Sequence, residues 1–263
     1  MSLISLATRT VLRQLLLGRT WAGDLVVDQP LDPIAEVMRH ATGKPAPVIA
    51  IYTAEAKGEP CGLETQGGPQ AIKMMVYVYL PPSRIDLPDG VSLEIDNVGS
   101  ALALNIMGRQ VDAAMHFGNT DWIALWRKFV TRIAEKTSRF ILVQIEQGVP
   151  IPCLEIQYEL TCVADADFGK PIYGGWLKLD ALLRAKGTEG ADLADLIKGL
   201  IEGPQGLPDY EQFQVNFGLS ASAVDAIGIA PVLGSADDDG NVPPLNEVTG
   251  DPEITVVGPS EVP

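Results

Sequence analysis

The sequence contains few of the side chains on which enzymes and metal sites most often rely. Its 263 residues include two histidines, His40 and His116, and three widely spaced cysteines, Cys61, Cys153 and Cys162. Two histidines nearly exclude a histidine-rich metal site, and an odd number of distant cysteines suits neither a disulfide framework nor a metal cluster. We therefore expect no bound metal, and reduced, partly buried thiols in a protein made in a cytoplasm, where disulfides are rare.

Long apolar runs are also absent. No stretch approaches the roughly 18 apolar residues that a membrane-spanning helix needs. The first segment, Met1 to Leu17, is interrupted by Arg9 and Arg13 and is not followed by a small-residue cleavage pattern. We interpret it as a mature helix and not as a signal peptide, and we expect no membrane partner.

Basic residues are scarce in the last third of the chain. From Gly187 onward there are fourteen Asp or Glu and one Lys, a net charge of -13, which leaves -2 of the total of -15 for residues 1–186. Binding to a nucleic-acid backbone depends on Lys and Arg that release counterions. The acidic third should therefore repel DNA, and the sequence predicts no tight nucleic-acid binding.

Catalytic and phosphate-binding motifs are missing as well. The glycine-rich loop from Lys57 to Gln70 has neither Walker nor Gly-x-Gly-x-x-Gly spacing, and Gly218 to Ser222 lacks the closing glycine of a nucleophile elbow. Asp237 to Gly240 lacks the ligand spacing of a calcium loop and is interpreted as a solvated acidic turn. Asp112 and His116 have helical spacing, but without a nearby nucleophile a surface ion pair is the preferred interpretation. We expect no catalytic residues and no cofactor.

The residues that are present predict an ordered series of helices and strands. Helical spacing of apolar residues predicts an amphipathic helix over Ser2 to Leu17, which runs into the turn Gly18-Arg19-Thr20-Trp21-Ala22-Gly23. Strands are expected at Leu25–Val27, Val48–Ala54, Ile72–Leu80, Cys153–Val163 and Phe213–Leu219. Helices are expected at Pro33–His40, Asn97–Phe117, Trp122–Ser138, Leu177–Lys186 and Ala191–Ile201.

This order predicts an α/β (α+β) fold, a mixed β-sheet with helices packed on it, followed by a C-terminal extension. We divide the chain into a first domain at 1–172, an extension with short helices and a strand at 173–233, and an acidic, loosely ordered tail at 234–263. On the alternating strand Cys153 to Val163, the polar side chains face away from the apolar ones. That polar face is either exposed to water or borders a subunit contact or a lumen.

The same segments, taken in order, carry a family resemblance over about residues 3–172. They are the N-terminal helix, the Gly-Arg-Thr-Trp-Ala-Gly turn, the strand Pro47 to Thr53, the tyrosine-bearing strand at 72–80, a helical middle, and the strand Ile156 to Leu160 before Ala-Asp-Ala-Asp-Phe-Gly. In this order the chain resembles the tail terminator proteins of long-tailed bacteriophages, the minor tail protein U-like family. Residues 173–263 extend beyond the compact domain of that family.

The resemblance implies a structural virion protein at the junction of tail and neck, made in the host cytoplasm. It implies an α/β domain that assembles into a homohexameric ring, caps the tail tube, ends tube polymerisation and joins the tail to the neck. The implied partners are further copies of the chain, the tail tube protein and a neck or connector protein, and DNA is expected to pass through the ring lumen. The family has no catalytic residues to transfer. We take as interface candidates Arg19, Thr20, Trp21, Glu155, Gln157 and Glu159.

Two alternatives stay open at this point. The first is a head-completion or neck connector protein, whose loss would give free heads and normal tails, whereas loss of a terminator gives overlong tails. The second is a small cytoplasmic hydrolase or transferase with an unrecognised site. That alternative needs a pocket with Asp112, His116 or Glu155 near its mouth.

Overall fold

The computed structural model describes residues 2–30, 46–58, 68–81, 84–86, 92–94, 97–117, 120–143, 150–167 and 169–203. All of these lie in one compact unit, Met1–Gln205. The helix expected at 33–40, the strand expected at 213–219, the acidic tail and Cys61 lie outside the described residues.

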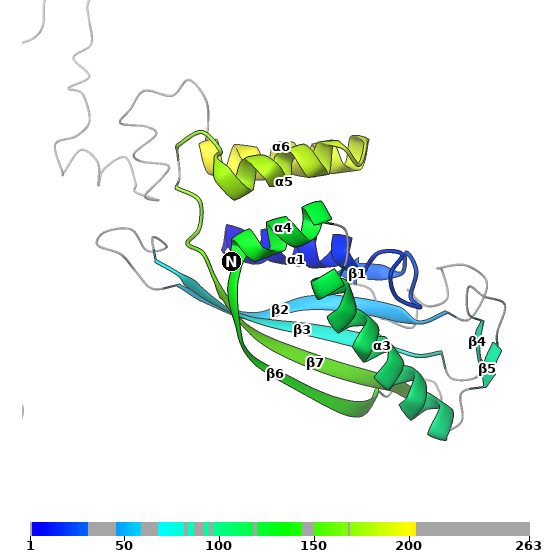
Figure 1. Cartoon of the computed structure of the whole chain (residues 1–263). Coiled ribbons are helices and arrows are strands. Elements are labelled where there is room, and N and C mark those ends of the chain that lie inside the picture. Colours follow the sequence, from blue (N-terminus) through cyan, green and yellow to red (C-terminus); the bar gives the residue numbers. More distant parts are fainter. Residues whose placement is uncertain are drawn as a thin grey trace, which may run out of the picture. The chain divides into compact units, whose positions relative to one another are not determined.

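A five-stranded mixed sheet lies at the centre of the first unit (Figure 1). In spatial order its strands are β1 (Val26–Asp28), β2 (Val48–Gly58), β3 (Gln70–Tyr79), β7 (Ile151–Cys162) and β6 (Val130–Val143). β1 is parallel to β2, and the other neighbouring strands are antiparallel. Two short strands, β4 (Arg84–Asp86) and β5 (Ser92–Glu94), pair separately. The predicted mixed fold class is confirmed.

The alternating pattern of the central strands explains which way the sheet faces. On β3, Met74, Val76 and Val78 belong to the main apolar cluster with the helices, whereas Tyr77 and Tyr79 belong to a second, smaller cluster on the opposite face. β7 alternates in the same register and contributes Leu154, Ile156, Tyr158 and Leu160 to the main cluster. The alternation expected for both strands is confirmed.

Three helices cover one face of the sheet, and a helical hairpin packs on them. The covering helices are α1 (Leu3–Leu16), α3 (Asn97–Phe117) and α4 (Thr120–Phe129). The hairpin consists of α5 (Gly174–Arg184) and α6 (Thr188–Glu202), and it contacts α4 (Figure 1). Figure 1 shows α1 and α4 between this hairpin and the sheet. The helix expected at Asn97–Phe117 is found with the same bounds.

Helix α1 is fixed to the sheet by polar contacts as well as apolar ones. Arg9 is only 3% exposed, and its Nε donates to Asp28 Oδ1 at 2.6 Å while its Nη1 donates to Thr53 Oγ1 at 2.9 Å. At the start of the helix, the Ser2 hydroxyl caps Ser5 N–H and the buried Asp165 carboxylate accepts a hydrogen bond from Ile4 N–H. A helix N-terminus favours such acceptors because its first N–H groups have no partner within the helix.

The helix expected at Trp122–Ser138 is wrong in its second half. The apolar stripe of Trp122, Trp126 and Phe129 is buried as expected, but the helix ends at Phe129 and the chain continues as strand β6 from Val130. The segment 130–143 is rich in β-branched residues and pairs with β7 over most of its length. Pairing with a neighbouring strand therefore outweighs the local helical spacing of Ile133 and Ala134.

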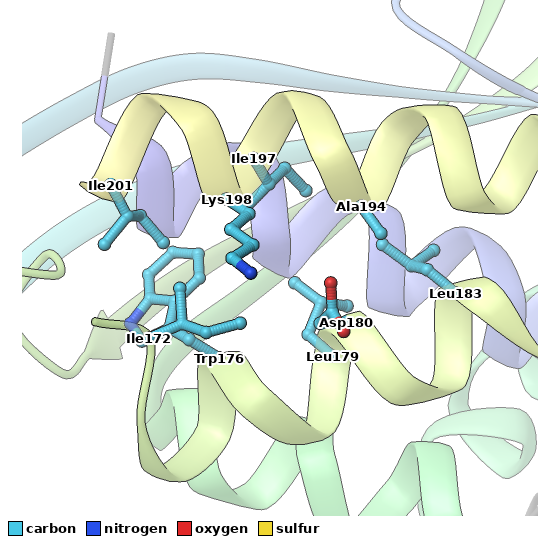
Figure 2. A pocket seen from close by; sticks show the side chains of 9 residues that line it. All are labelled: Ile172, Trp176, Leu179, Asp180, Leu183, Ala194, Ile197, Lys198 and Ile201. Atoms are coloured by element: carbon cyan, nitrogen blue, oxygen red, sulfur yellow. The ribbon is translucent and has the colours of Figure 1, made fainter. Parts of the chain in front are cut away.

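The first helices of the predicted extension share the core of the sheet domain. Trp176 is 6% exposed and its ring centroid lies 5.2 Å from that of Phe129 at the end of α4. The seam between α5 and α6 leaves no space for a water molecule. Figure 2 shows the residues that line it: Ile172, Trp176, Leu179, Asp180, Leu183, Ala194, Ile197, Lys198 and Ile201. Residues 174–202 are therefore part of the same compact unit as the sheet.

Candidate interaction surface

Strand β6 is the most unusual element of the described unit. It forms one edge of the sheet, so no described strand pairs with its outer side. It is 14 residues long, and every side chain from Thr131 to Phe140 is exposed. Phe140 and Leu142 are exposed by 54% and 68%. Proteins usually shorten or cover such edges because an open strand with apolar side chains attracts other chains, and this edge therefore indicates an interaction surface.

The surroundings of β6 are basic although the chain is acidic. Residues 127–139 contain five of the 19 Lys and Arg of the chain and a single acidic residue, Glu135. The five bases are all exposed: Arg127, Lys128, Arg132, Lys136 and Arg139. Arg132 forms no ion pair with any described residue. A local excess of positive charge in a chain of net charge -15 favours contact with an acidic surface.

Helix α3 holds the middle of β6 through a buried hydroxyl and an ion pair. The carboxylate of Asp112 accepts hydrogen bonds from Lys136 Nζ at 2.7 Å and from the Tyr158 hydroxyl at 3.1 Å. Lys136 Nζ also lies 5.8 Å from the centroid of the Tyr158 ring. Burial, followed by the neighbouring Asp112 carboxylate, raises the pKa of Tyr158, so its hydroxyl stays a donor. These contacts join α3, β6 and β7.

On the opposite face of the sheet, Arg139 of β6 reaches across to β7. Its Nε and Nη2 donate to the two carboxylate oxygens of Glu155 at 2.6 and 3.1 Å. The hydrogen bond from Arg139 holds the pKa of Glu155 below its usual value, and Tyr77 adds to this effect. Such a two-point contact between guanidinium and carboxylate fixes geometry as well as charge. Glu155 therefore has a structural role, because it joins β7 to β6 on this face of the sheet.

The same face contains a tyrosine cluster and a buried thiol. The rings of Tyr52 and Tyr77 meet edge to face with centroids 5.6 Å apart, and Tyr77 stacks on Tyr79 at 6.0 Å. Burial raises the pKa of Tyr77 to about 12 and that of the Cys153 thiol to about 12. On the helix side, burial raises the pKa of Cys162 to about 11. Thiols with such values are protonated at neutral pH and are poor nucleophiles.

The structure places the six interface candidates in two separate groups. Arg19, Thr20 and Trp21 lie in the turn after α1, which is closed by a hydrogen bond from Gly18 N–H to the Gly23 carbonyl, with both glycines at positive φ. Trp21 N–H donates to Gln110 of α3, so the turn belongs to the helix side.

The other three candidates lie on β7 and point away from the helices. Glu155 is paired with Arg139, Gln157 lies opposite Thr137, and Glu159 lies opposite Glu135. Of the six, Arg19 and Glu159 are exposed, whereas Thr20 and Glu155 are both 6% exposed and therefore buried in the single chain. The two groups thus do not form one patch.

The expected ion pair between Asp112 and His116 is wrong. His116 Nδ1 lies 2.8 Å from the main-chain carbonyl oxygen of Asp112, while the Asp112 carboxylate is occupied by Lys136 and Tyr158. The carboxylate therefore does not orient the imidazole. Asp112 lies on the helix side of the sheet and Glu155 on the other side, so the structure does not bring these candidates together.

Two sites in the described unit are candidate pockets for chemistry, and Asp112, His116 and Glu155 line neither of them. One is the closed seam of α5 and α6 (Figure 2). The other, of about 440 Å³, is lined by Thr10, Arg13, Gln14, Val27, Asp28, Pro30 and Leu193. Among the described residues, no three or more His, Cys, Asp or Glu are grouped so as to hold a metal ion. None of the described helices is both long and apolar enough to cross a membrane.

This chain has been compared with models of protein families and with curated proteins. No protein-family model matches it, and no curated protein matches it. The function is therefore argued from the sequence pattern and from the surfaces described above.

Reasoning from the sequence missed the residues of β6. Arg132, Phe140 and Leu142 were not among the candidates because their segment was expected to be partly helical. A usable signal was the density of β-branched residues in 130–143, which include Val130, Thr131, Ile133, Thr137, Ile141 and Val143. An exposed strand at a sheet edge can be located only once the strand order is known.

Proposed function

We propose that this protein is a structural component of a phage virion that forms a ring on the end of the tail tube, ends tube polymerisation and joins the tail to the neck. Its partners are further copies of itself, the tail tube protein and a neck protein. The order of helix, turn, strands, helical middle and closing strand supports this proposal, because the same order carries the resemblance to the tail terminator proteins of long-tailed phages.

The single observation that carries the assembly role is the open edge of β6. A 14-residue strand with exposed side chains on both faces and apolar residues at its end is a contact surface that needs a partner. Buried thiols with raised pKa values and a carboxylate engaged by Lys136 provide few groups for chemistry in the described unit. A ring has two different contact patches per subunit, and an open edge is suited to be one of them.

The test is to image particles assembled without this protein by negative-stain electron microscopy. We expect tails of widely varying and excessive length, because nothing ends polymerisation of the tube. Purified protein added to growing tubes should restore one length and appear as a cap on the tube end. Free heads beside tails of normal length would instead indicate a head-completion or neck connector protein and would contradict the proposal.

A further inference from the structure

Exposed apolar side chains gather on two elements of the described unit. Nine large apolar side chains are exposed there, of which three lie on β6 and four lie on the α5–α6 hairpin or at its N-cap. The three are Ile133, Phe140 and Leu142, and the four are Tyr173, Leu177, Leu196 and Leu200. Single exposed apolar residues are normal, but their concentration on two elements marks contact surfaces.

One exposed face of α6 combines leucines with acidic residues. Glu189, Asp192, Leu196 and Leu200 are spaced by three, four and four residues, so they follow one face of the helix. We call these four residues the α6 surface. The opposite side of the helix is buried through Ala194, Ile197 and Ile201. Neither Glu189 nor Asp192 forms an ion pair with a described residue.

The exposed side chains of β6, which project from both faces of the strand at its open edge, have the complementary character. We call Arg132, Ile133, Lys136, Arg139, Phe140 and Leu142 the β6 surface. It contains three basic and three apolar side chains. Lys136 and Arg139 already pair with Asp112 and Glu155, so Arg132 is the base of this surface that has no ion pair among the described residues. The α6 surface contains two acidic and two apolar side chains. Complementary charge of this kind steers two surfaces together and fixes their register.

The two surfaces cannot meet within one subunit. β6 is an edge strand of the sheet, while α6 belongs to the hairpin that packs on α4, with the α1 and α4 layer between the hairpin and the sheet (Figure 1). They can meet only between two copies of the chain. A contact between two different patches of the same protein is heterologous, and such contacts form a ring when the rotation between neighbouring copies closes.

We propose that the α6 surface of one copy docks on the β6 surface of the next copy and forms the contact that closes the ring. This inference rests on the proposed function for the presence of a ring and adds which residues make it. A helix laid along an exposed strand is one of the ways in which proteins protect a sheet edge. The acidic residues of α6 face Arg132, and its leucines pack against the neighbouring Ile133. The acidic α6 surface repels the phosphates of DNA. A second copy of the chain can therefore contact both surfaces, whereas DNA cannot.

The experiment reverses one charge on each surface. Arg132→Glu and Asp192→Lys are made separately and together in the full chain, and assembly is followed by sedimentation velocity and by capping of tail tubes in micrographs. Each single variant should need at least about tenfold more protein to assemble, because like charges then face each other across the contact. The double variant should assemble like the wild type.

Mixing the two single variants separates this contact from other arrangements. In an alternating ring of even number, the reversed β6 surface of one variant meets the reversed α6 surface of the other, and the remaining contacts are those of the wild type. At the concentration at which the wild type assembles, an equimolar mixture should therefore form rings, whereas each variant alone should not. Contact between two β6 edges would not be rescued in this way.

Matched controls come from α3, which carries neither surface. Arg109→Glu reverses an exposed charge there, and Leu102→Asp is compared with Leu196→Asp because Leu102 and Leu196 are 56% and 57% exposed. The α3 variants should assemble normally, and Leu196→Asp should not. Circular dichroism checks that every variant is folded.

The outcomes distinguish this contact from the proposed function itself. If the wild type forms rings and the single variants form them equally well, the α6–β6 contact is wrong while the ring stands. Loss of assembly without rescue by mixing also overturns it. Weaker binding of a duplex DNA fragment by Arg132→Glu, with assembly unchanged, would assign β6 to DNA and overturn the inference. If particles without the protein have tails of normal length, the proposed function fails, whatever the variants do.

Discussion

Two buried charged residues attach α1 to the rest of the unit. The guanidinium of Arg9 donates hydrogen bonds to the Asp28 carboxylate and to the Thr53 hydroxyl. Asp165 is different, because one of its oxygens accepts from Ile4 N–H while Oδ2 is buried with no partner in the described structure. Burial raises the pKa of Asp165 even though the start of α1 favours its charged form.

The raised pKa of Asp165 predicts a pH-dependent difference from Asp165→Asn. The folded state takes up a proton at a higher pH than the unfolded state, whose carboxyl titrates near 3.8. At pH values between the pKa of the unfolded state and the higher pKa of the folded state, the folded state binds more protons. The free energy of unfolding therefore falls as the pH rises through this range. Wild type should therefore gain stability relative to Asp165→Asn as pH is lowered from 7 toward 4.

Urea unfolding of both proteins at several pH values measures this difference. Asp167→Asn, at a half-buried position two residues further on, controls for the change in net charge. A difference between wild type and Asp165→Asn that stays constant from pH 7 to pH 4 would show that burial does not perturb this carboxyl.

At the level of residues, the sequence predicted the alternation of β3 and β7 because it depends only on positions two apart. It did not predict the burial of Thr20 and Glu155. Glu155 is buried because Arg139 and Tyr77, from distant parts of the chain, surround it. Such pairings depend on strand register, which the local pattern does not contain.

At the level of elements, strand β6 shows where prediction from the sequence fails. The stripe from Trp122 to Phe129 is a true helical pattern, and Ile133 and Ala134 continue it by coincidence. The residues that make 130–143 a strand are its pairing partners on β7. By contrast, α3 was predicted with the observed bounds because its apolar pattern coincides with the face that covers the sheet.

The attachment of β6 to α3 gives a prediction for Asp112→Ala. The substitution leaves the buried Tyr158 hydroxyl without its acceptor and removes the ion pair of Lys136, at a cost of about 1–3 kcal/mol. Since Lys136 lies in the middle of β6, amide hydrogen exchange should become faster across 130–143 and stay unchanged in β2. Mass spectrometry of peptides from the two strands measures both.

The variant Tyr158→Phe is the control for this prediction, because it removes the hydroxyl that Asp112 accepts from. In that background Asp112→Ala should cost about 1 kcal/mol less than in the wild type. Equal costs in both backgrounds would mean that the hydrogen bond between Tyr158 and Asp112 contributes nothing to stability.

At the level of the whole molecule, the α5–α6 hairpin belongs to the same compact unit as the sheet. Trp176 packs on Phe129, and Gly175 lies so close to the Phe129 ring that a Cβ there would be only 2.8 Å from it. Lys178 also pairs with Asp121 of α4 at 3.1 Å. The hairpin should therefore unfold with the sheet and not before it.

Trp176→Ala tests this cooperativity. Removal of a buried indole costs about 3–5 kcal/mol, and if the hairpin and the sheet share one core, the loss destabilises both. Amide hydrogen exchange should then become faster in β3 as well as in α5 and α6. The urea concentration at the unfolding midpoint should fall, while the slope of the unfolding free energy against urea concentration stays unchanged.

The control is the neighbouring Leu177, which is 55% exposed, so Leu177→Ala should change stability by no more than about 0.5 kcal/mol. Acceleration confined to 174–202 in Trp176→Ala would mean that the hairpin unfolds independently. Its α6 surface could then be presented to a neighbouring copy by a movable arm instead of a rigid subunit.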